Sequence, residues 1–263
     1  MFIADTSQRT FIGVSTLLFA ASAALTVACC GSMSVMHDMP MPGGWSMSMM
    51  WMRMPGQSLP ASASTFLGMW LVMMVAMMLP SLLPMLWRYR RGIGYSRGMR
   101  DAGLTMLVGS AYFAVWTLFG ALAFIIGTTL AELEMQSPAL ARVVPVASGV
   151  VVLIAGALQF SAWKSHHLAC CRNTPACCDA LRPDPSTAWR HGLRLGLHCV
   201  HCCFGLTMIL LVIGVMDLRA MAVVTAAISA ERMAPAGERT ARVIGVIAMI
   251  AGVFLIGRAA LFE

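Results

Sequence analysis

Seven long stretches of the chain carry almost no charge, and they limit the fold more than any other feature. They cover residues 11–30, 64–86, 103–128, 143–162, 195–214, 218–230 and 243–257. A helix needs about 20 consecutive apolar residues to cross a bilayer, and only helices and closed barrels satisfy their backbone polar groups there. Charged residues make up 11% of the chain, against about 25% in a typical soluble domain. We therefore expect an all-α, polytopic membrane helix bundle with six or seven transmembrane helices, and residues 1–263 as a single integral membrane domain.

Two of these stretches have a second interpretation. The stretch 218–230 is short for a span and lies between Asp217 and Glu231, so it is either a tilted helix or a half-span. We favour seven helices over six. The stretch 11–30 also has the length of a signal-peptide core, but only Arg9 supplies positive charge before it. We therefore expect an uncleaved first helix.

Lysines and arginines are distributed unevenly between the connecting segments. Fourteen of the eighteen fall at position 9 and in the segments 88–100, 164–194 and 232–242, which would share one side of a membrane. The positive-inside rule makes that side cytoplasmic. We expect a multi-pass protein of a bacterial inner (cytoplasmic) membrane, with a cytoplasmic N-terminus, an outer loop at 31–63 and a cytoplasmic loop at 163–194. This topology and attraction to anionic lipid account for the net charge of +7, so we expect the lipid bilayer and no nucleic acid as a partner.

Residues 197–204 combine three thiols and two imidazoles at the edge of an apolar stretch. In a helix Cys199, Cys202 and Cys203 share one face, and His198 and His201 lie at neighbouring angles. Such donors predict a soft-metal site, with Cu(I) as the first choice and zinc as the second. The alternative is that free cysteines act here as small buried hydrophobes.

The preceding polar loop carries further donors of the same kind. Thiols in a cytoplasm stay reduced and so remain available as ligands. We expect Cys171 and His167 to complete the site at the inner membrane face, with Cys170 as a further donor. Lys164 and Arg172 would offset the charge of bound thiolates, or else reach to the interface as ordinary snorkelling side chains.

Methionines gather on the other side of the predicted membrane. Nine of them, together with His37, lie within residues 33–54, and thioethers suit capture of Cu(I) in an oxidising compartment. In the second apolar stretch Met73 and Met77 share one face of a helix with Met69. Taken alone, such a stripe is more often core packing than a metal path. Pro80 and Pro84 predict a kink or an end of this helix.

An ordered set of motifs resembles a known family. It comprises the run from Met69 to Ser81, Lys164 with Cys171, Arg172 and Pro175, the stretches from Gly196 to Cys203 and from Gly214 to Leu218, and Glu231. Over roughly residues 64–235 the chain is similar to a bacterial family of predicted metal-binding integral membrane proteins, a domain of unknown function. That family usually carries a cysteine three residues after the lysine, where this chain has His167, and Cys170 could compensate. The resemblance implies metal binding and no particular reaction.

Three functions of different classes follow from these residues. The first is a copper-handling membrane protein that transports, tolerates or delivers Cu(I). The second is a non-catalytic membrane subunit whose metal site is structural and which assembles with a partner. The third is a membrane thiol-disulfide oxidoreductase that uses Cys199 and Cys202. The chain has no P-loop, H-E-x-x-H or G-x-S-x-G motif. We therefore favour a metal-binding protein over an enzyme, with another membrane or periplasmic protein as its partner.

Overall fold

The chain forms a helical bundle with one small hairpin. The computed structural model describes residues 2–34, 39–41, 45–48, 51, 56–93, 98–172 and 183–261. The described helices are α1 (Phe2–Ser34), α2 (Leu59–Gly92), α3 (Gly98–Gln136), α4 (Pro138–Leu158), α5 (Ala162–Arg172), α6 (Pro185–Ile213), α7 (Leu218–Met233) and α8 (Gly237–Leu261). Strands β1 (Met39–Met41) and β2 (Trp45–Met47) pair antiparallel in the predicted outer loop. The prediction of an all-α bundle is confirmed, with this hairpin as a minor addition.

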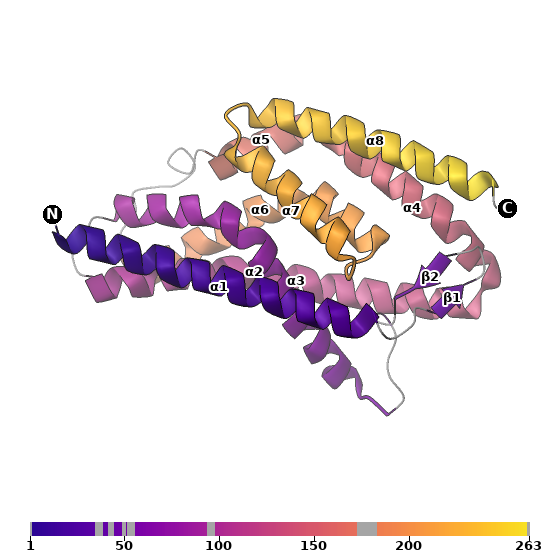
Figure 1. The fold of residues 1–263 in the computed structure, drawn as a ribbon, viewed down its shortest axis with the longest axis horizontal. Coiled ribbons are helices and arrows are strands. Elements are labelled where there is room, and N and C mark those ends of the chain that lie inside the picture. The colour runs from indigo at the N-terminus through magenta and orange to yellow at the C-terminus, as the bar shows by residue number, and fades with distance from the viewer. Residues whose placement is uncertain are drawn as a thin grey trace.

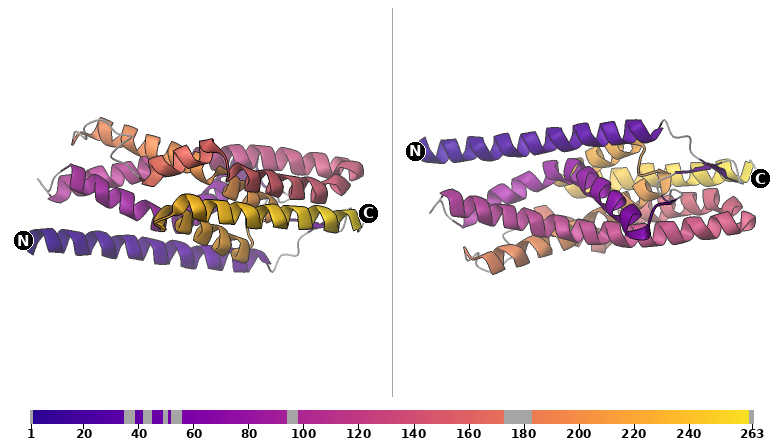
Figure 2. Two further views of the ribbon diagram at one scale, coloured as in Figure 1. Left: turned by 90° about the horizontal axis from the view of Figure 1, so that it is seen from above. Right: turned by 90° about the horizontal axis from the view of Figure 1, so that it is seen from below.

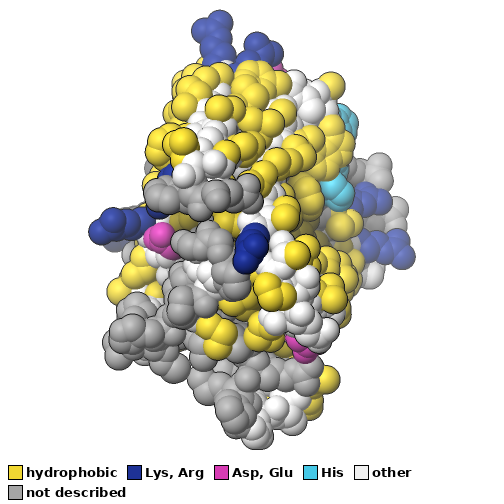
Figure 3. All heavy atoms as spheres, turned by 90° about the vertical axis from the view of Figure 1, so that its right-hand side faces the viewer, with side chains coloured by type: hydrophobic (Ala, Val, Ile, Leu, Met, Phe, Trp, Pro, Cys, Tyr) yellow, Lys and Arg dark blue, Asp and Glu magenta, His cyan; other side chains and the backbone are white. Residues whose placement is uncertain are grey.

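Six of the described helices are long and apolar enough to cross a membrane: α1, α2, α3, α4, α6 and α8. The number of helices that could span a membrane is therefore six, within the predicted six or seven. The disputed stretch 218–230 forms α7, a helix of 16 residues, which is shorter than a typical span. Hydrophobic side chains cover much of the face seen in Figure 3. Exposed residues of this kind include Leu17, Ile126 and Phe254, each more than 60% exposed, as expected where lipid is the solvent.

The described parts of the polar segment 163–194 are mostly helical. Its first part is α5, and α6 begins at Pro185, well before the apolar stretch that starts near residue 195. Asp184 caps α6 by accepting a hydrogen bond from the backbone of Thr187 at 2.9 Å. The chain ends lie at opposite ends of the bundle in Figures 1 and 2.

Two glycines of α6 let α3 approach closely and so position the donors that follow them. A Cβ atom at Gly192 would lie 2.4 Å from the carbonyl oxygen of Val108, and one at Gly196 would lie 3.0 Å from that of Tyr112. A side chain at either position would force the two backbones apart. This close contact brings Tyr112 of α3 against the turn of α6 that begins at Cys199.

Helix α2 contains Pro80 and Pro84 and changes direction along its length (Figure 1). Proline removes a backbone donor and clashes with the preceding turn, which explains the bend. Met73 and Met77 are both buried in the core, and Ser81 follows them on the same face one turn further on. The bend therefore presents Ser81 to the interior, where α7 packs against α2.

Candidate metal centre

Four buried cysteines from two helices form one contact group, which we call the thiol cluster: Cys171, Cys199, Cys202 and Cys203. None is more than 1% exposed. Cys199 and Cys203 lie one turn apart on α6, with their Sγ atoms 4.0 Å apart. The thiol of Cys202 interacts with those of Cys171 on α5 and of Cys203. The structure thus brings Cys171 to the three cysteines of α6, as the sequence predicted, and all seven described cysteines are free thiols.

The local sequence explains why the thiols face inward. On α5, Lys164, Leu168 and Cys171 are buried and follow one another at helical spacing, so they form its inner stripe. On α6, Cys199, Cys202, Cys203 and Leu206 form the corresponding stripe. The hydroxyl oxygen of Tyr112 lies 2.8 Å from the Sγ atom of Cys199. Tyr112 of α3 is therefore a polar neighbour of this stripe, at its first cysteine.

Arg232 of α7 extends its guanidinium group into the thiol cluster. One nitrogen donates to the Sγ atoms of both Cys171 and Cys203 at 3.6 Å, and another donates to the hydroxyl of Ser81 at 3.0 Å. Arg232 is 8% exposed. A buried cation needs a compensating negative charge, and the sulfurs are the groups here that can supply it as thiolates. Arg232 was not among the residues predicted from the sequence, although an ionisable residue at the end of an apolar stretch is a functional signal.

A buried ion pair lies beside the thiol cluster. The Nζ atom of Lys164 is 2.6 Å from the carboxylate of Glu231, and the two side chains are 5% and 1% exposed. The same Nζ atom donates to the backbone carbonyl of Cys202 at 2.6 Å. Burial opposes the charged form of Lys164, but the neighbouring Cys202 and Glu231 raise its pKa overall. Lys164 is therefore a buried cation held at the thiol cluster, and not an interfacial side chain.

Arg172 serves a different purpose from Lys164. It donates to the backbone carbonyls of Glu231 and Pro235, at 3.0 Å each, and its own carbonyl accepts a hydrogen bond from Arg88. It therefore joins the end of α5 to the connection between α7 and α8. Arg172 was predicted either to offset thiolate charge or to reach to the interface, whereas the guanidinium that contacts the thiols is that of Arg232.

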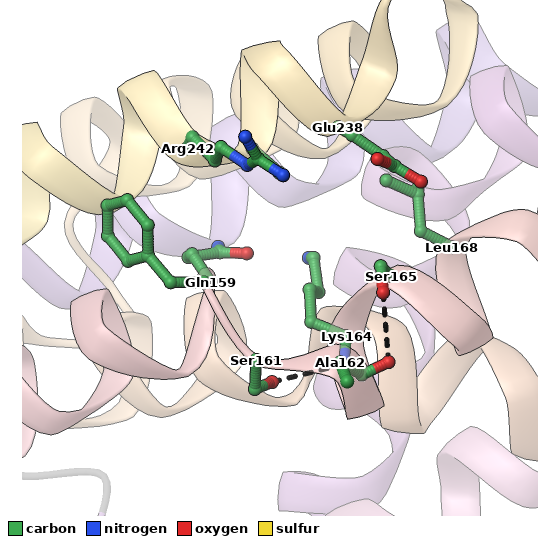
Figure 4. Close-up of a pocket in the computed structure, with 10 residues that line it drawn as sticks. Gln159, Ser161, Ala162, Lys164, Ser165, Leu168, Glu238 and Arg242 are labelled. Atoms are coloured by element: carbon green, nitrogen blue, oxygen red, sulfur yellow. Dashed lines mark hydrogen bonds between the residues drawn. The ribbon is translucent and has the colours of Figure 1, made fainter.

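A cavity of about 220 Å³ opens beside Lys164, between α5, the end of α4 and the start of α8. Figure 4 shows the side chains of Gln159, Lys164 and Arg242 directed into it. The amide group of Gln159 is buried and has no hydrogen-bond partner in the described structure. The cavity is large enough for water and lies next to Lys164, whose ion pair with Glu231 adjoins Cys202.

The histidines predicted as ligands lie apart from the thiols, on the outer side of the same two helices. The Nδ1 atoms of His167 and His198 are 3.2 Å apart, and the rings of His167 and His201 stack with centroids 4.9 Å apart. We call these three residues the imidazole cluster. Burial and the neighbouring imidazoles lower the pKa of His167. Cys170 lies with His166, Sγ to Nε2 3.9 Å, and not with the thiol cluster.

The remaining predicted donors lie elsewhere. Met73 and Met77 are buried on α2. This helix is linked to the thiol cluster by the hydrogen bond between Ser81 and Arg232. His37 lies outside the described residues. A sulfur pair that the sequence analysis missed joins Cys30 of α1 to Met216, with Sγ and Sδ 3.6 Å apart. Within the described ranges, no group of three or more His, Cys, Asp and Glu side chains is already arranged to hold a metal ion.

Comparison with known proteins gives one family. The sequence model of the family PpoB2, described as a copper chaperone, matches residues 67–255. No match is found among curated proteins or among solved structures. The matched region contains α3 to α7 and most of α2 and α8, and therefore both the thiol cluster and Arg232. The description names copper, the metal that the donor set favoured, and says nothing of a membrane.

Proposed function

The chain belongs to the PpoB2 copper chaperone family, and we propose that it binds Cu(I) in the thiol cluster of a membrane bundle and delivers it to another protein. The observation that carries this proposal is the group of four buried free thiols in contact with the guanidinium of Arg232. Thiolates select Cu(I) among the available metals. A core that only needed small hydrophobes would have no use for a buried cation among them.

The buried charges match one Cu(I) ion bound by two thiolates. Lys164 and Glu231 cancel each other, and Arg232 contributes one positive charge. Cu(I) with two thiolates carries one negative charge, so the loaded site is neutral overall. A neutral site avoids the large cost of an uncompensated charge in a low-dielectric interior.

The buried charge of the site favours Cu(I) over zinc. Structural zinc sites use four ligands in a tetrahedron, and Zn(II) with four thiolates carries two negative charges, of which Arg232 offsets only one. A soft monovalent ion is satisfied by few thiolates. We therefore expect the chain, purified anaerobically in detergent and offered Cu(I) and Zn(II) together, to retain Cu(I) against a chelator and to lose Zn(II). Preferential retention of Zn(II), or of neither metal, would overturn the proposal.

Sulfur donors beyond the thiol cluster support transfer through the bundle. Met73, Met77 and Ser81 lie on one face of α2, with a rise of about 6 Å between successive members, and Ser81 contacts Arg232. The sulfur pair Cys30–Met216 lies on other elements of the bundle. With the thiol end in the cytoplasm and the methionine-rich loop outside, as the arginine distribution predicts, this protein belongs in a bacterial inner membrane. Its partner would then be a membrane or periplasmic protein that accepts copper.

The methionine face separates copper transfer from static binding. Met73→Leu with Met77→Leu conserves volume, so we expect a loss of less than about 1.5 kcal/mol in stability. Leucine offers no sulfur, so transfer of Cu(I) across proteoliposomes should fall while Cu(I) binding at the thiol cluster persists. Met106→Leu, which alters an exposed methionine on α3, is the matched control. Unchanged transfer in the double variant would favour the static metal-binding subunit.

A further inference from the structure

The imidazole cluster lies on a different face of α6 from the thiol cluster. His198 and His201 directly precede Cys199 and Cys202, so the two sets of donors share the same two turns of the helix. The cysteines are at most 1% exposed, whereas His201 is exposed and His198 is half-buried. His167 of α5 is also half-buried and contacts both of them. The histidines therefore do not complete the thiol site, and they form a separate group at the surface.

The hydrogen bonds of this cluster leave nitrogen lone pairs free for a ligand. The Nδ1 atom of His201 donates to the carbonyl of Leu197 at 2.7 Å, so its Nε2 atom carries a lone pair. The Nδ1 atoms of His167 and His198 are 3.2 Å apart, and only one of them can donate in that contact. The other nitrogen accepts through its lone pair, which becomes available to a metal ion once that contact is broken. A backbone carbonyl that fixes the ring tautomer is the usual second partner of a metal-binding histidine.

Trp163 limits the freedom of the two stacked rings. Its ring meets those of His167 and His201 edge-on, with centroids 5.1 Å and 5.6 Å apart. The stack itself is nearly parallel, with 17° between the ring planes. Imidazoles held this way lose little conformational freedom when they bind a common ion. Ordinary surface histidines have no such shared arrangement.

We propose that His167, His198 and His201 form a second metal site, distinct from the thiol cluster, which takes a transition-metal ion of the class that imidazole favours. The ion replaces the contact between His167 and His198, and the Nε2 atom of His201 is the third donor. That the ion is copper rests on the proposed function. The site captures the ion at the surface, and its residue His201 directly precedes Cys202 of the thiol cluster in α6.

Cu(II) is a direct probe of this site, because imidazole nitrogens give it a recognisable paramagnetic resonance spectrum. The full chain is purified through a tag without histidine, with the four cysteines of the thiol cluster replaced by serine. We expect Cu(II) to bind with imidazole nitrogen coordination, and His167→Gln with His198→Gln to weaken binding at least 10-fold. His191→Gln removes another imidazole of α6, one that stacks on Tyr89, and should leave the spectrum unchanged. Cu(II) without nitrogen coordination, or equal binding by the double histidine variant, would refute the site.

A second preparation covers the case in which the serine variant fails to fold. The parent chain is first loaded with Ag(I), which is diamagnetic and occupies thiolates, and then receives Cu(II). The same nitrogen signature is expected, and its absence refutes the imidazole site. Failure of the proposed function would give a different result: the parent chain would not bind Ag(I), but the nitrogen signature of Cu(II) would remain.

Discussion

Replacing Cys199, Cys202 and Cys203 together by serine is expected to lower the affinity for Cu(I) by more than about 100-fold. Loss of outer partners of a metal site alone costs about 10- to 100-fold in affinity, and this variant removes three sulfurs directly. Serine keeps the size of cysteine but offers a hard oxygen that Cu(I) does not favour. The measurement is anaerobic competition against a chromophoric Cu(I) chelator, with the purified chain in detergent.

Cys29→Ser is the matched control, because Cys29 lies on α1 outside the thiol cluster and is only half-buried. Three buried hydroxyls also carry a desolvation cost, so thermal unfolding and monodispersity are followed in parallel. The single variant Cys199→Ser gives a folded alternative, with a smaller loss of affinity expected. If a folded triple variant bound Cu(I) as tightly as the parent, the thiol cluster would not be the copper site.

The helices of this fold could be predicted from apolar stretches, but their ends could not. The stretch 103–128 forms the centre of α3, which extends over Gly98–Gln136. The extensions are polar and are held by contacts that sequence periodicity does not reveal. Helix α5 was expected to be loop, because its outward residues His166 and His167 interrupt the apolar pattern. The inner stripe that begins at Lys164 was nonetheless present at helical spacing.

The candidate site shows the same limit. Cys199, Cys202 and Cys203 could be grouped from sequence because helical spacing alone places them on one face. The contact of Cys202 with Cys171 depends on how α5 packs against α6, which the sequence does not show. Cys171 was predicted to join the site only because it is a further thiol in the preceding segment. The histidines lie apart from the thiols because of how α5 and α6 are oriented about their own axes. The sequence motifs do not specify that orientation. Arg232 was missed because its partners Ser81 and Cys171 lie far away in the sequence.

Arg232 gives the second large effect that the structure predicts. Its guanidinium is buried against two sulfurs of the thiol cluster and one hydroxyl. The bound form of the proposed site needs this positive charge, since Cu(I) with two thiolates is anionic. The metal-free form needs it less, because thiols can take up protons and become neutral. The charge of Arg232 should therefore matter more for metal affinity than for the stability of the metal-free fold.

Arg232→Gln is accordingly expected to weaken Cu(I) binding by about 10- to 100-fold, the usual range for an outer partner of a metal site. The unfolding temperature of the metal-free chain should change little, because the thiols of the variant can take up protons and so leave no buried negative charge unpaired. Arg232→Lys keeps the charge and should recover part of the affinity. Chelator competition and thermal unfolding, each with and without Cu(I), give the two quantities.

Arg242→Gln supplies the control of equal charge, because Arg242 lines the cavity of Figure 4 and has no recorded contact with the thiols. It lowers the net charge by the same amount as Arg232→Gln, so any general electrostatic effect appears in both variants. Charge compensation at the thiol cluster requires that only the Arg232 variant loses affinity for Cu(I). If Arg232→Gln instead destabilised the metal-free chain and bound Cu(I) normally once folded, Arg232 would be a packing residue. The matching of its charge to an anionic copper complex would then be wrong.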